Sequence, residues 1–240
     1  RPKAEVSAYG VNAGTLSVGV SSATANVSTM VNAFVGGAGN TIIGDSLTVA
    51  ANQLKPSTGY SGLAKTTGSA GGLIGIDATI SNVTNTGNVT SYVKDGTILY
   101  ISGGTVISAN SNTRQKASAN ANAVGLVAAG ISAADVTTDT DTRAYLGSGV
   151  NLTGGSLTIT ASGNDNNFAD TVSGSVGGLS VAAATADTTT DSTTIAEIRG
   201  GSGIDLTGSG SGAFEITADH TSAFNGRIRA LAGGLIGGAG

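Results

Sequence analysis

Residues 175–181 read SVGGLSV, and closely similar segments return four more times along the chain. They are NAGTLSV at 12–18, SAGGLIG at 69–75, NAVGLVA at 122–128 and LAGGLIG at 231–237. The leucines of these segments are Leu16, Leu73, Leu126, Leu179 and Leu235, so the period is about 53 positions. A period of this size is typical of a repeat protein, in which each unit buries its apolar side chains against its neighbours.

Two further landmarks return with the leucines. An aromatic or acidic residue follows each of the first four leucines by 18 or 19 positions, namely Phe34, Tyr92, Tyr145 and Glu197. An aliphatic residue follows later in each repeat, namely Val49, Ile107, Ile159 and Ile216. We place the repeat units at approximately 1–29, 30–87, 88–140, 141–193 and 194–240. Residues 1–240 then form a single continuous segment, which we expect to be part of a longer repeat chain.

Two stretches interrupt the period. The gap between Val49 and Leu73 contains KPSTGYSG at 55–62, with the only interior proline, Pro56. The segment GSGSG at 208–212 lengthens the last repeat. Because insertions in stacked repeats map to loops, we predict that residues 53–62 leave the stack and that 208–212 form a loop.

The composition favours strands over helices and disorder. The chain has 39 glycines, 2 prolines, 39% hydrophobic residues, 11% charged residues and a net charge of −4. Disordered chains combine low hydrophobicity with high net charge, which this chain does not. Glycine, serine, threonine, asparagine and valine are poor helix formers, whereas threonine, valine and isoleucine in alternating runs favour strands.

Alternation along the repeat predicts which residues face the core. In SLTITAS at 156–162, the apolar residues Leu157, Ile159 and Ala161 share one face of a strand. In 172–183 the apolar residues change parity across the glycine pair at 177–178. A change of parity requires a bend or bulge, so we predict a corner there and at 233–234. We expect valine, isoleucine, leucine and alanine to fill a thin interior.

These patterns predict an all-β fold, specifically a β-solenoid related to the parallel β-helix. Because the coils of β-solenoids are commonly less than half as long as this period, we expect two coils in each repeat. Nine or so coils about 4.8 Å apart would give a rod roughly 45 Å long. The alternative is an antiparallel β-sandwich or a stack of long hairpins, although short hairpin turns such as Asn-Gly are sparse.

Several classes of site are disfavoured by what the sequence lacks. There is no cysteine, which excludes disulfides, thiol nucleophiles and cysteine-bound zinc. The pI is about 4.7 and basic residues occur only in pairs, so we expect no nucleic-acid binding. No apolar run reaches the 18–20 residues of a spanning helix, so we expect no transmembrane segment.

Acidic residues could bind calcium at two places. GGSGIDLTG at 200–208, with Asp205, is similar to the calcium-binding nonapeptide, but that motif acts in tandem and occurs here once. Asp139 and Asp141 lie at alternate positions and so share one face of a strand, and Asp187 and Asp191 lie in the matching part of the next repeat. We interpret these four as an exposed acidic ladder and expect no metal or cofactor site.

The only histidine, His220, is the one residue that could serve a Ser–His–Asp relay. Its sequence neighbour Asp219 points to the opposite face of a strand, which is the wrong geometry. No Gly-x-Ser-x-Gly nucleophile elbow is placed at a strand–helix junction. We therefore expect no catalytic residues and no enzymatic activity.

The segments RAYLGSGVNLTGGSLTITAS at 143–162 and GGLSVAAATA at 177–186 resemble the β-helical repeats of very large bacterial exoproteins. These are the filamentous-haemagglutinin-like and leukotoxin-type filamentous adhesins. The resemblance implies a secreted or surface-displayed shaft and carries no catalytic residue.

We therefore expect a structural segment of an extracellular bacterial filament or adhesin shaft that associates with neighbouring repeats or identical chains. Exposed strand edges would be one route to that association. The alternative is a binding module that contacts glycan or another cell surface through an exposed Thr/Asp/Asn face or through 53–62. That alternative calls for an aromatic platform, and the tyrosines do not cluster by spacing.

Overall fold

The computed structural model describes residues 1–207 and 212–240, and all regular structure in them is β-strand. The first six strands are β1 (Ala4–Ala13), β2 (Leu16–Val35), β3 (Thr41–Gly44), β4 (Leu47–Gln53), β5 (Gly62–Gly71) and β6 (Ile74–Val93). The remaining six are β7 (Ile98–Val124), β8 (Val127–Leu146), β9 (Asn151–Thr190), β10 (Thr193–Ile198), β11 (Gly203–Asp205) and β12 (Phe214–Ala239). The predicted all-β class is confirmed.

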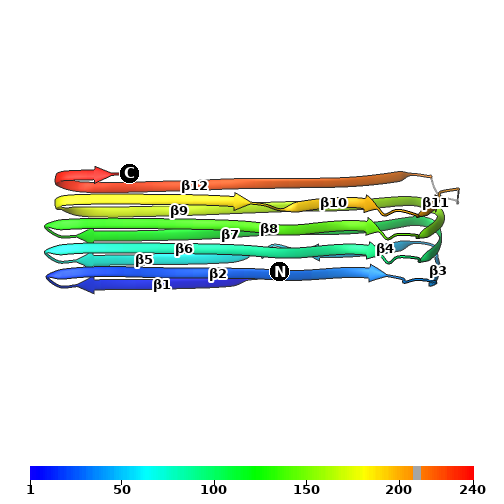
Figure 1. Cartoon of the computed structure of the whole chain (residues 1–240), viewed down its shortest axis with the longest axis horizontal. Helices are drawn as coiled ribbons and strands as arrows, with labels where there is room; N and C mark the ends of the chain where they lie inside the picture. The colour runs from blue at the N-terminus through cyan, green and yellow to red at the C-terminus, as the bar shows by residue number, and fades with distance from the viewer. Residues whose placement is uncertain (208–211) are drawn as a thin grey trace.

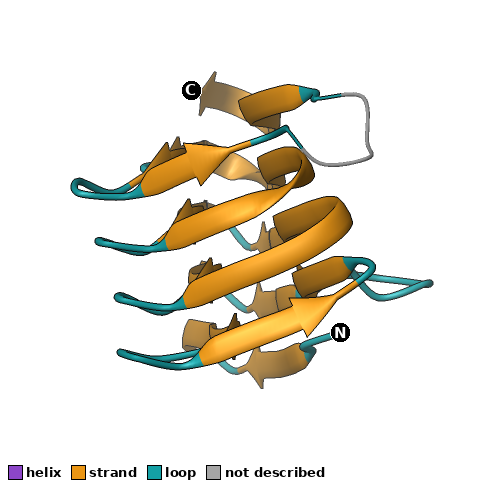
Figure 2. Ribbon diagram, turned by 90° about the vertical axis from the view of Figure 1, so that its right-hand side faces the viewer, coloured by secondary structure: helices purple, strands orange, loops and turns teal. Residues whose placement is uncertain are grey.

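The chain winds around a flattened coil with two long walls and one short one (Figures 1 and 2). Wall A contains β1, β4, β5, β7 from residue 104, β9 from 156 to 176, and β12 as far as Gly233. Wall B contains β2, β6, β8, β9 from 179 to 190, β10, and the last residues of β12 from 236. A short end wall contains β3, β11 and the first residues of β7 and β9.

Every strand pairing among the described residues is parallel. Gly62 pairs with Gln115, 53 positions further on, and Gln115 pairs with Asn167, 52 positions further on. This parallel, β-helix-like arrangement excludes the antiparallel sandwich and the stacked hairpins. The expectation of two coils in each repeat is wrong, because the hydrogen-bonded neighbour of a residue lies a whole repeat away.

The dimensions of the coil also differ from those expected. Strands β2, β6 and β8 each have 20 residues, and a strand of that length measures about 65 Å. Wall A has five layers, β1, β5, β7, β9 and β12, which at a spacing of about 4.8 Å stack to only about 20 Å. The expected stack of nine small coils, about 45 Å high, is therefore wrong, and the long axis of this segment runs along the strands.

At one end of the coil, here called the arch end, the chain crosses directly from wall A to wall B at residues 14–15, 72–73, 125–126, 177–178 and 233–235 (Figure 1, left). Strand β9 pairs with β7 up to Val176 and with β8 from Leu179, so the predicted corner at 177–178 is confirmed.

Glycine is required at the arch end because successive arches lie directly on one another. A Cβ atom at Gly72 would overlap the backbone carbonyl oxygen of Gly14, and one at Gly177 would overlap that of Gly125. Gly234 has the same relation to Gly177. The glycine in the repeated segment is therefore a packing requirement of the stack.

At the opposite end, here called the turn end, wall B leads through a short turn into the end wall. Gly39, Gly96, Gly149 and Gly201 have positive φ values of 77°, 67°, 65° and 78° in successive turns. The turns are hydrogen bonded to one another, for example from Gly96 N to Ser148 O at 2.9 Å. The end wall widens the coil here and makes room for large side chains.

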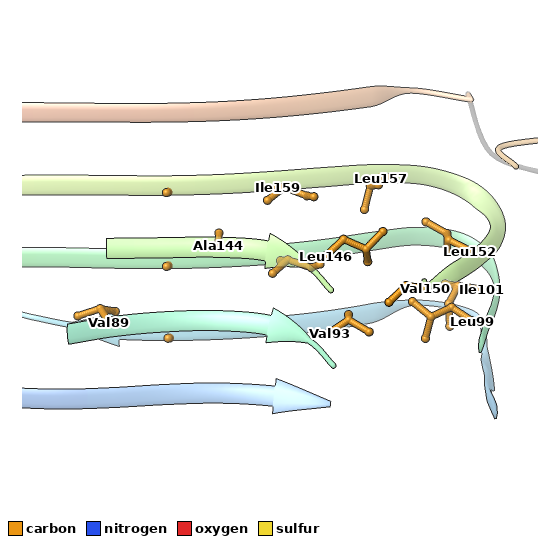
Figure 3. Close-up of a cluster of buried hydrophobic side chains, with 14 residues drawn as sticks. Val89, Val93, Leu99, Ile101, Ala144, Leu146, Val150, Leu152, Leu157 and Ile159 are labelled. Atoms are coloured by element: carbon orange, nitrogen blue, oxygen red, sulfur yellow. The ribbon is translucent and has the colours of Figure 1, made fainter. Parts of the chain in front are cut away.

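The largest side chains of the core lie near the turn end (Figure 3). Leu99 and Ile101 of β7, Leu146 of β8 and Leu152 of β9 are at most 1% exposed. The predicted inward set Leu157, Ile159 and Ala161 is fully buried in the same cluster, as expected. A second, smaller cluster toward the arch end consists of alanines and two valines, Val83 and Val136.

The interior changes character at the arch end, where the expectation that aliphatic residues face inward is wrong. Ser180 and Ala182 point inward and are at most 1% exposed, whereas Leu179 and Val181 point outward and are 45% and 49% exposed. The walls are so close that the Ser132 hydroxyl of wall B donates to the Val172 carbonyl of wall A at 2.7 Å. Small side chains fill most of this gap, so the large aliphatic ones face out.

The predicted excursion at 53–62 is confirmed in position. Gln53 pairs with Ser111 and Gly62 pairs with Gln115, so the segment 54–61 stands opposite only 112–114 in the neighbouring coil. The predicted loop at 208–212 lies, except for Gly212, outside the described residues.

We predict that Gly72→Ala lowers the free energy of unfolding by about 1–3 kcal/mol, because the added methyl group overlaps the Gly14 carbonyl. Gly71→Ala is the matched control, since a Cβ there meets nothing within 4 Å. Urea denaturation of both variants tests this, and equal midpoints would contradict the proposed role of the arch glycine.

Candidate functional site

The acidic residues Asp139 and Asp141 lie on the outer face of wall B, as predicted. They line a shallow depression of about 260 Å³ together with Met30, Thr86 and Asn88. Asp139 is exposed, and Asp141 lies 3.5 Å from Arg143 Nη2 in an ion pair. The depression offers carboxylate, amide and hydroxyl groups at the surface but only one open carboxylate, because Arg143 already neutralises the other.

The other two acids of the expected ladder, Asp187 and Asp191, are also exposed. The ladder further includes Asp135, which sequence reasoning did not find. Asp187 pairs in register with Asp135, and both side chains face outward. Burial raises the pKa of Asp135, and the neighbouring charge of Asp187 raises it further. Asp191 follows Asp187 by four positions and donates its backbone N–H to the Thr138 carbonyl at 2.8 Å. Three of the four predicted acids therefore lie on adjoining strands of wall B, and Asp191 lies in the short break between β9 and β10.

Asp205 lies apart from these acids, in β11 of the end wall. Its Oδ1 accepts the backbone N–H of Thr207 at 3.1 Å, which closes a local turn. The residues at the same position in the preceding coils are Thr153, Tyr100 and Ile43. Because no carboxylate stands above or below Asp205 in the described coils, the tandem arrangement of the calcium nonapeptide is missing here.

In the described part of the chain, no three histidine, aspartate or glutamate side chains gather into a group that could hold a metal ion. Nor does that part contain a helix long and apolar enough to cross a membrane.

His220 has partners that sequence reasoning did not find. Asp219 and His220 point to opposite faces of the strand, as predicted, with Asp219 exposed and His220 half-buried. Its Nδ1 lies 2.9 Å from Thr194 Oγ1, and its Nε2 lies 3.0 Å from Ser222 Oγ and 3.5 Å from Asp165 Oδ2. Serine and aspartate thus approach the same ring nitrogen, whereas a Ser–His–Asp relay needs them on opposite nitrogens.

Asp165 connects this cluster to the interior. It is 1% exposed and accepts hydrogen bonds from Thr113 Oγ1 at 2.6 Å and from Thr140 Oγ1 at 3.4 Å. The network joins β7, β8, β9, β10 and β12 across the coil. The signal that could have found it is the repeat offset, which places His220 beside Gly163, two positions before Asp165.

The landmark residues Phe34, Tyr92 and Tyr145 form a stacked ladder on the outer face of wall B. The ring centroids of Phe34 and Tyr92 are 5.4 Å apart, and those of Tyr92 and Tyr145 are 4.7 Å apart with an interplanar angle of 12°. Tyr92 and Tyr145, which recur at the same place in the repeat, therefore stack on each other. Glu197 continues the same column.

Cations flank the aromatic ladder. Lys94 Nζ lies 4.1 Å from the Phe34 centroid, and Arg199 Cζ lies 3.6 Å from the Tyr145 centroid. Burial raises the pKa of the Tyr145 hydroxyl, while the Arg199 charge opposes this shift. Tyr92 thus has a ring on each side, and Tyr145 lies between Tyr92 and Arg199. Their faces are already occupied, whereas a sugar-binding platform needs an open ring face.

The excursion at 54–61 has its own aromatic contact. Tyr60 meets Phe168 edge to face, with centroids 6.0 Å apart. The guanidinium of Arg114 lies 4.8 Å from the Tyr60 ring and 5.2 Å from the Phe168 ring. These contacts fasten the excursion to wall A.

The middle of the interior contains buried amides with and without partners. Asn167 accepts from Thr138 Oγ1 at 2.9 Å and donates to Thr190 Oγ1 at 2.8 Å. In contrast, both polar atoms of the Asn85 and Gln53 amides are buried without a hydrogen-bond partner among the described residues. Such groups cost about 1–3 kcal/mol each.

Asp77 is a buried carboxylate that the sequence did not single out. It is 1% exposed, and its Oδ2 accepts the backbone N–H of Asn122 at 3.1 Å. It fits because Gly19 and Gly130 are its register neighbours and the Cβ-free face of Gly68 lies against the carboxyl group. Burial raises the pKa of Asp77, and the Asn122 hydrogen bond only partly opposes this.

We predict that Asn85→Val raises the free energy of unfolding by about 1 kcal/mol, because it removes an unpartnered amide. Valine fits the position, since its register neighbour in the adjoining coil is Val27. The matched control is Asn167→Val, which should lower stability by about 1–3 kcal/mol by leaving Thr138 and Thr190 unpaired. Urea denaturation measures the free energy of unfolding of both variants. Loss of stability in both would contradict the difference between an amide without partners and one with them.

We predict that Asp77→Asn raises the melting temperature near pH 7 by about 2–4 °C. The folded state favours the protonated acid, so this group stabilises the fold at low pH and loses that contribution as pH rises through its raised pKa. Wild type and variant should therefore converge below about pH 4. Thermal scans from pH 3 to pH 8 test this, with the exposed Asp139→Asn as control. A difference that persists at pH 3 would contradict it.

Comparison of the chain with protein-family models, with curated proteins and with solved structures gives no match. No family is therefore assigned, and function rests on the geometry of the chain itself.

Proposed function

We propose that this chain is a segment of a β-solenoid in which each repeat unit forms one coil, and that it serves as a structural shaft. The setting we propose is an extracellular bacterial filament or the stalk of a surface adhesin. In this role the chain needs no bound cofactor and no catalytic group. The contacts that build the shaft are those between one coil and the next.

The observation that carries this proposal is the coil-to-coil contact itself. Each wall is a continuous parallel ladder, in which β6 pairs along its whole length with β2 on one side and with β8 on the other. Side chains reinforce the same direction through the Phe34–Tyr92–Tyr145 ladder and the stacked arches and turns. A coil that makes the same contacts above and below can be repeated indefinitely, which suits a shaft.

The occupied ring faces support a structural role over glycan binding. Carbohydrate recognition generally uses an aromatic face that is open to solvent, whereas here Tyr145 lies between Tyr92 and Arg199. The excursion aromatics Tyr60 and Phe168 are likewise flanked by Arg114.

A second candidate is favoured by one observation, the depression around Asp139 and Asp141. Its lining of Thr86, Asn88 and two carboxylates offers hydrogen-bond donors and acceptors suited to a polar surface ligand such as a glycan. We keep this Thr/Asp/Asn face as the alternative.

Immunogold electron microscopy with antibodies raised against residues 1–240, on whole mounts and thin sections of bacteria that produce the chain, tests the proposal. We expect label distributed along extracellular filaments or stalks, because a shaft exposes the same coils along its length. Label confined to the cell interior would overturn the proposal.

Glycan-array binding by the purified chain separates the two candidates. Binding that is lost in an Asp139→Asn/Asp141→Asn double variant would favour the glycan-contacting face. Asp205→Asn is the matched control, because Asp205 is also an exposed acid but lies outside the depression.

A further inference from the structure

The outer face of wall B is apolar at the arch end. Three outward positions per coil carry aliphatic side chains in four successive coils, and we call these residues the apolar face. They are Leu16, Val18 and Val20 in the first coil, Ile74, Ile76 and Ala78 in the second, Val127, Ala129 and Ile131 in the third, and Leu179, Val181 and Ala183 in the fourth.

This face is a consequence of the narrow interior. Inward neighbours such as Ser17, Asp77 and Ser180 are at most 3% exposed, while Ile131 and Leu179 on the outside are 48% and 45% exposed. In this part of wall B the aliphatic side chains therefore face solvent and the small or polar ones face the interior, which is the reverse of an ordinary half-buried sheet. A contiguous apolar surface of this kind marks an interaction site.

We infer that two copies of this chain pack their apolar faces against each other, sheet on sheet. Eight of the twelve side chains are between 37% and 72% exposed, so the face offers a contiguous aliphatic surface to a partner, and a standard interface takes roughly 800 Å² from each partner. The face is flat and repeats from strand to strand, so a second copy related by a two-fold axis matches it.

The distribution of charge favours a second copy over a lipid surface. Strand β2 has no charged residue, and the outward positions of 74–80, 127–133 and 179–185 have none either. The nearest outward charges along the strands are the acids Asp135 and Asp187, paired in register at the border of the apolar face. Helices and sheets that bind anionic membranes carry lysine and arginine at this border instead.

This inference deepens the proposed function, on which its biological meaning rests, by naming lateral pairing of shafts as a contact separate from coil stacking. Its failure is distinguishable from failure of the proposed function. A chain that stays monomeric would remove lateral pairing and leave the immunogold result on filaments unchanged.

Sedimentation velocity of the full chain at about 50 µM provides the test. We expect a dimer for the wild type and a monomer for an Ile131→Glu/Leu179→Glu variant, because two buried carboxylates per copy oppose the packing. The matched control is Val124→Glu, which places a charge on a 57% exposed arch-end residue of wall A and should leave the dimer intact. Far-UV circular dichroism checks that each variant keeps its strand content.

Cross-linking gives a second readout that does not depend on introduced charge. The chain has no cysteine, so Ala129→Cys at the middle of the apolar face should yield a disulfide-linked dimer under mild oxidation. Asn122→Cys on the outer face of wall A should not. The inference would be overturned by a wild type that is monomeric, or by a dimer that survives the double glutamate change. It would also be overturned if the wild type bound phosphatidylcholine vesicles and formed no dimer.

Discussion

The distance between the two walls at the arch end is the constraint on which most of this structure depends. Successive arches cross from wall A to wall B with glycine packed onto the carbonyl of the arch below, as Gly177 is onto Gly125. The walls leave the arch so close together that the Ser132 side chain reaches the backbone of the opposite wall. Serine, alanine, glycine and threonine fill most of this space, with Asp77 accommodated against glycine, so the aliphatic residues of these segments lie outside.

The coil widens away from the arch, and its interior changes in step. A cluster of alanines with Val83 and Val136 comes first, and leucines and isoleucines fill the space beside the end wall. Between these zones lie buried polar residues, some satisfied like Asn167 and some not, like Asn85. Stability therefore comes largely from the backbone ladder and from apolar burial near the turn end.

The outer surface of wall B is divided in the same way. Near the turn end it carries the aromatic ladder and its flanking cations, with Tyr145 between Tyr92 and Arg199. The middle carries the acids, and the arch end carries the apolar face. Coil stacking and lateral pairing thus use different surfaces, which allows a shaft to grow in length and to associate sideways independently.

The sequence alone determined the strand content, the repeat period, the corner at 177–178, the excursion after Gln53 and the shared position of Tyr92 and Tyr145. These follow from local periodicity and glycine placement, which are properties of neighbouring residues. Only the tertiary structure decided that one repeat makes one coil, that Leu179 faces out while Ser180 faces in, and that His220 meets Asp165. Alternation shows that two faces differ, but the space between the walls decides which of them is buried.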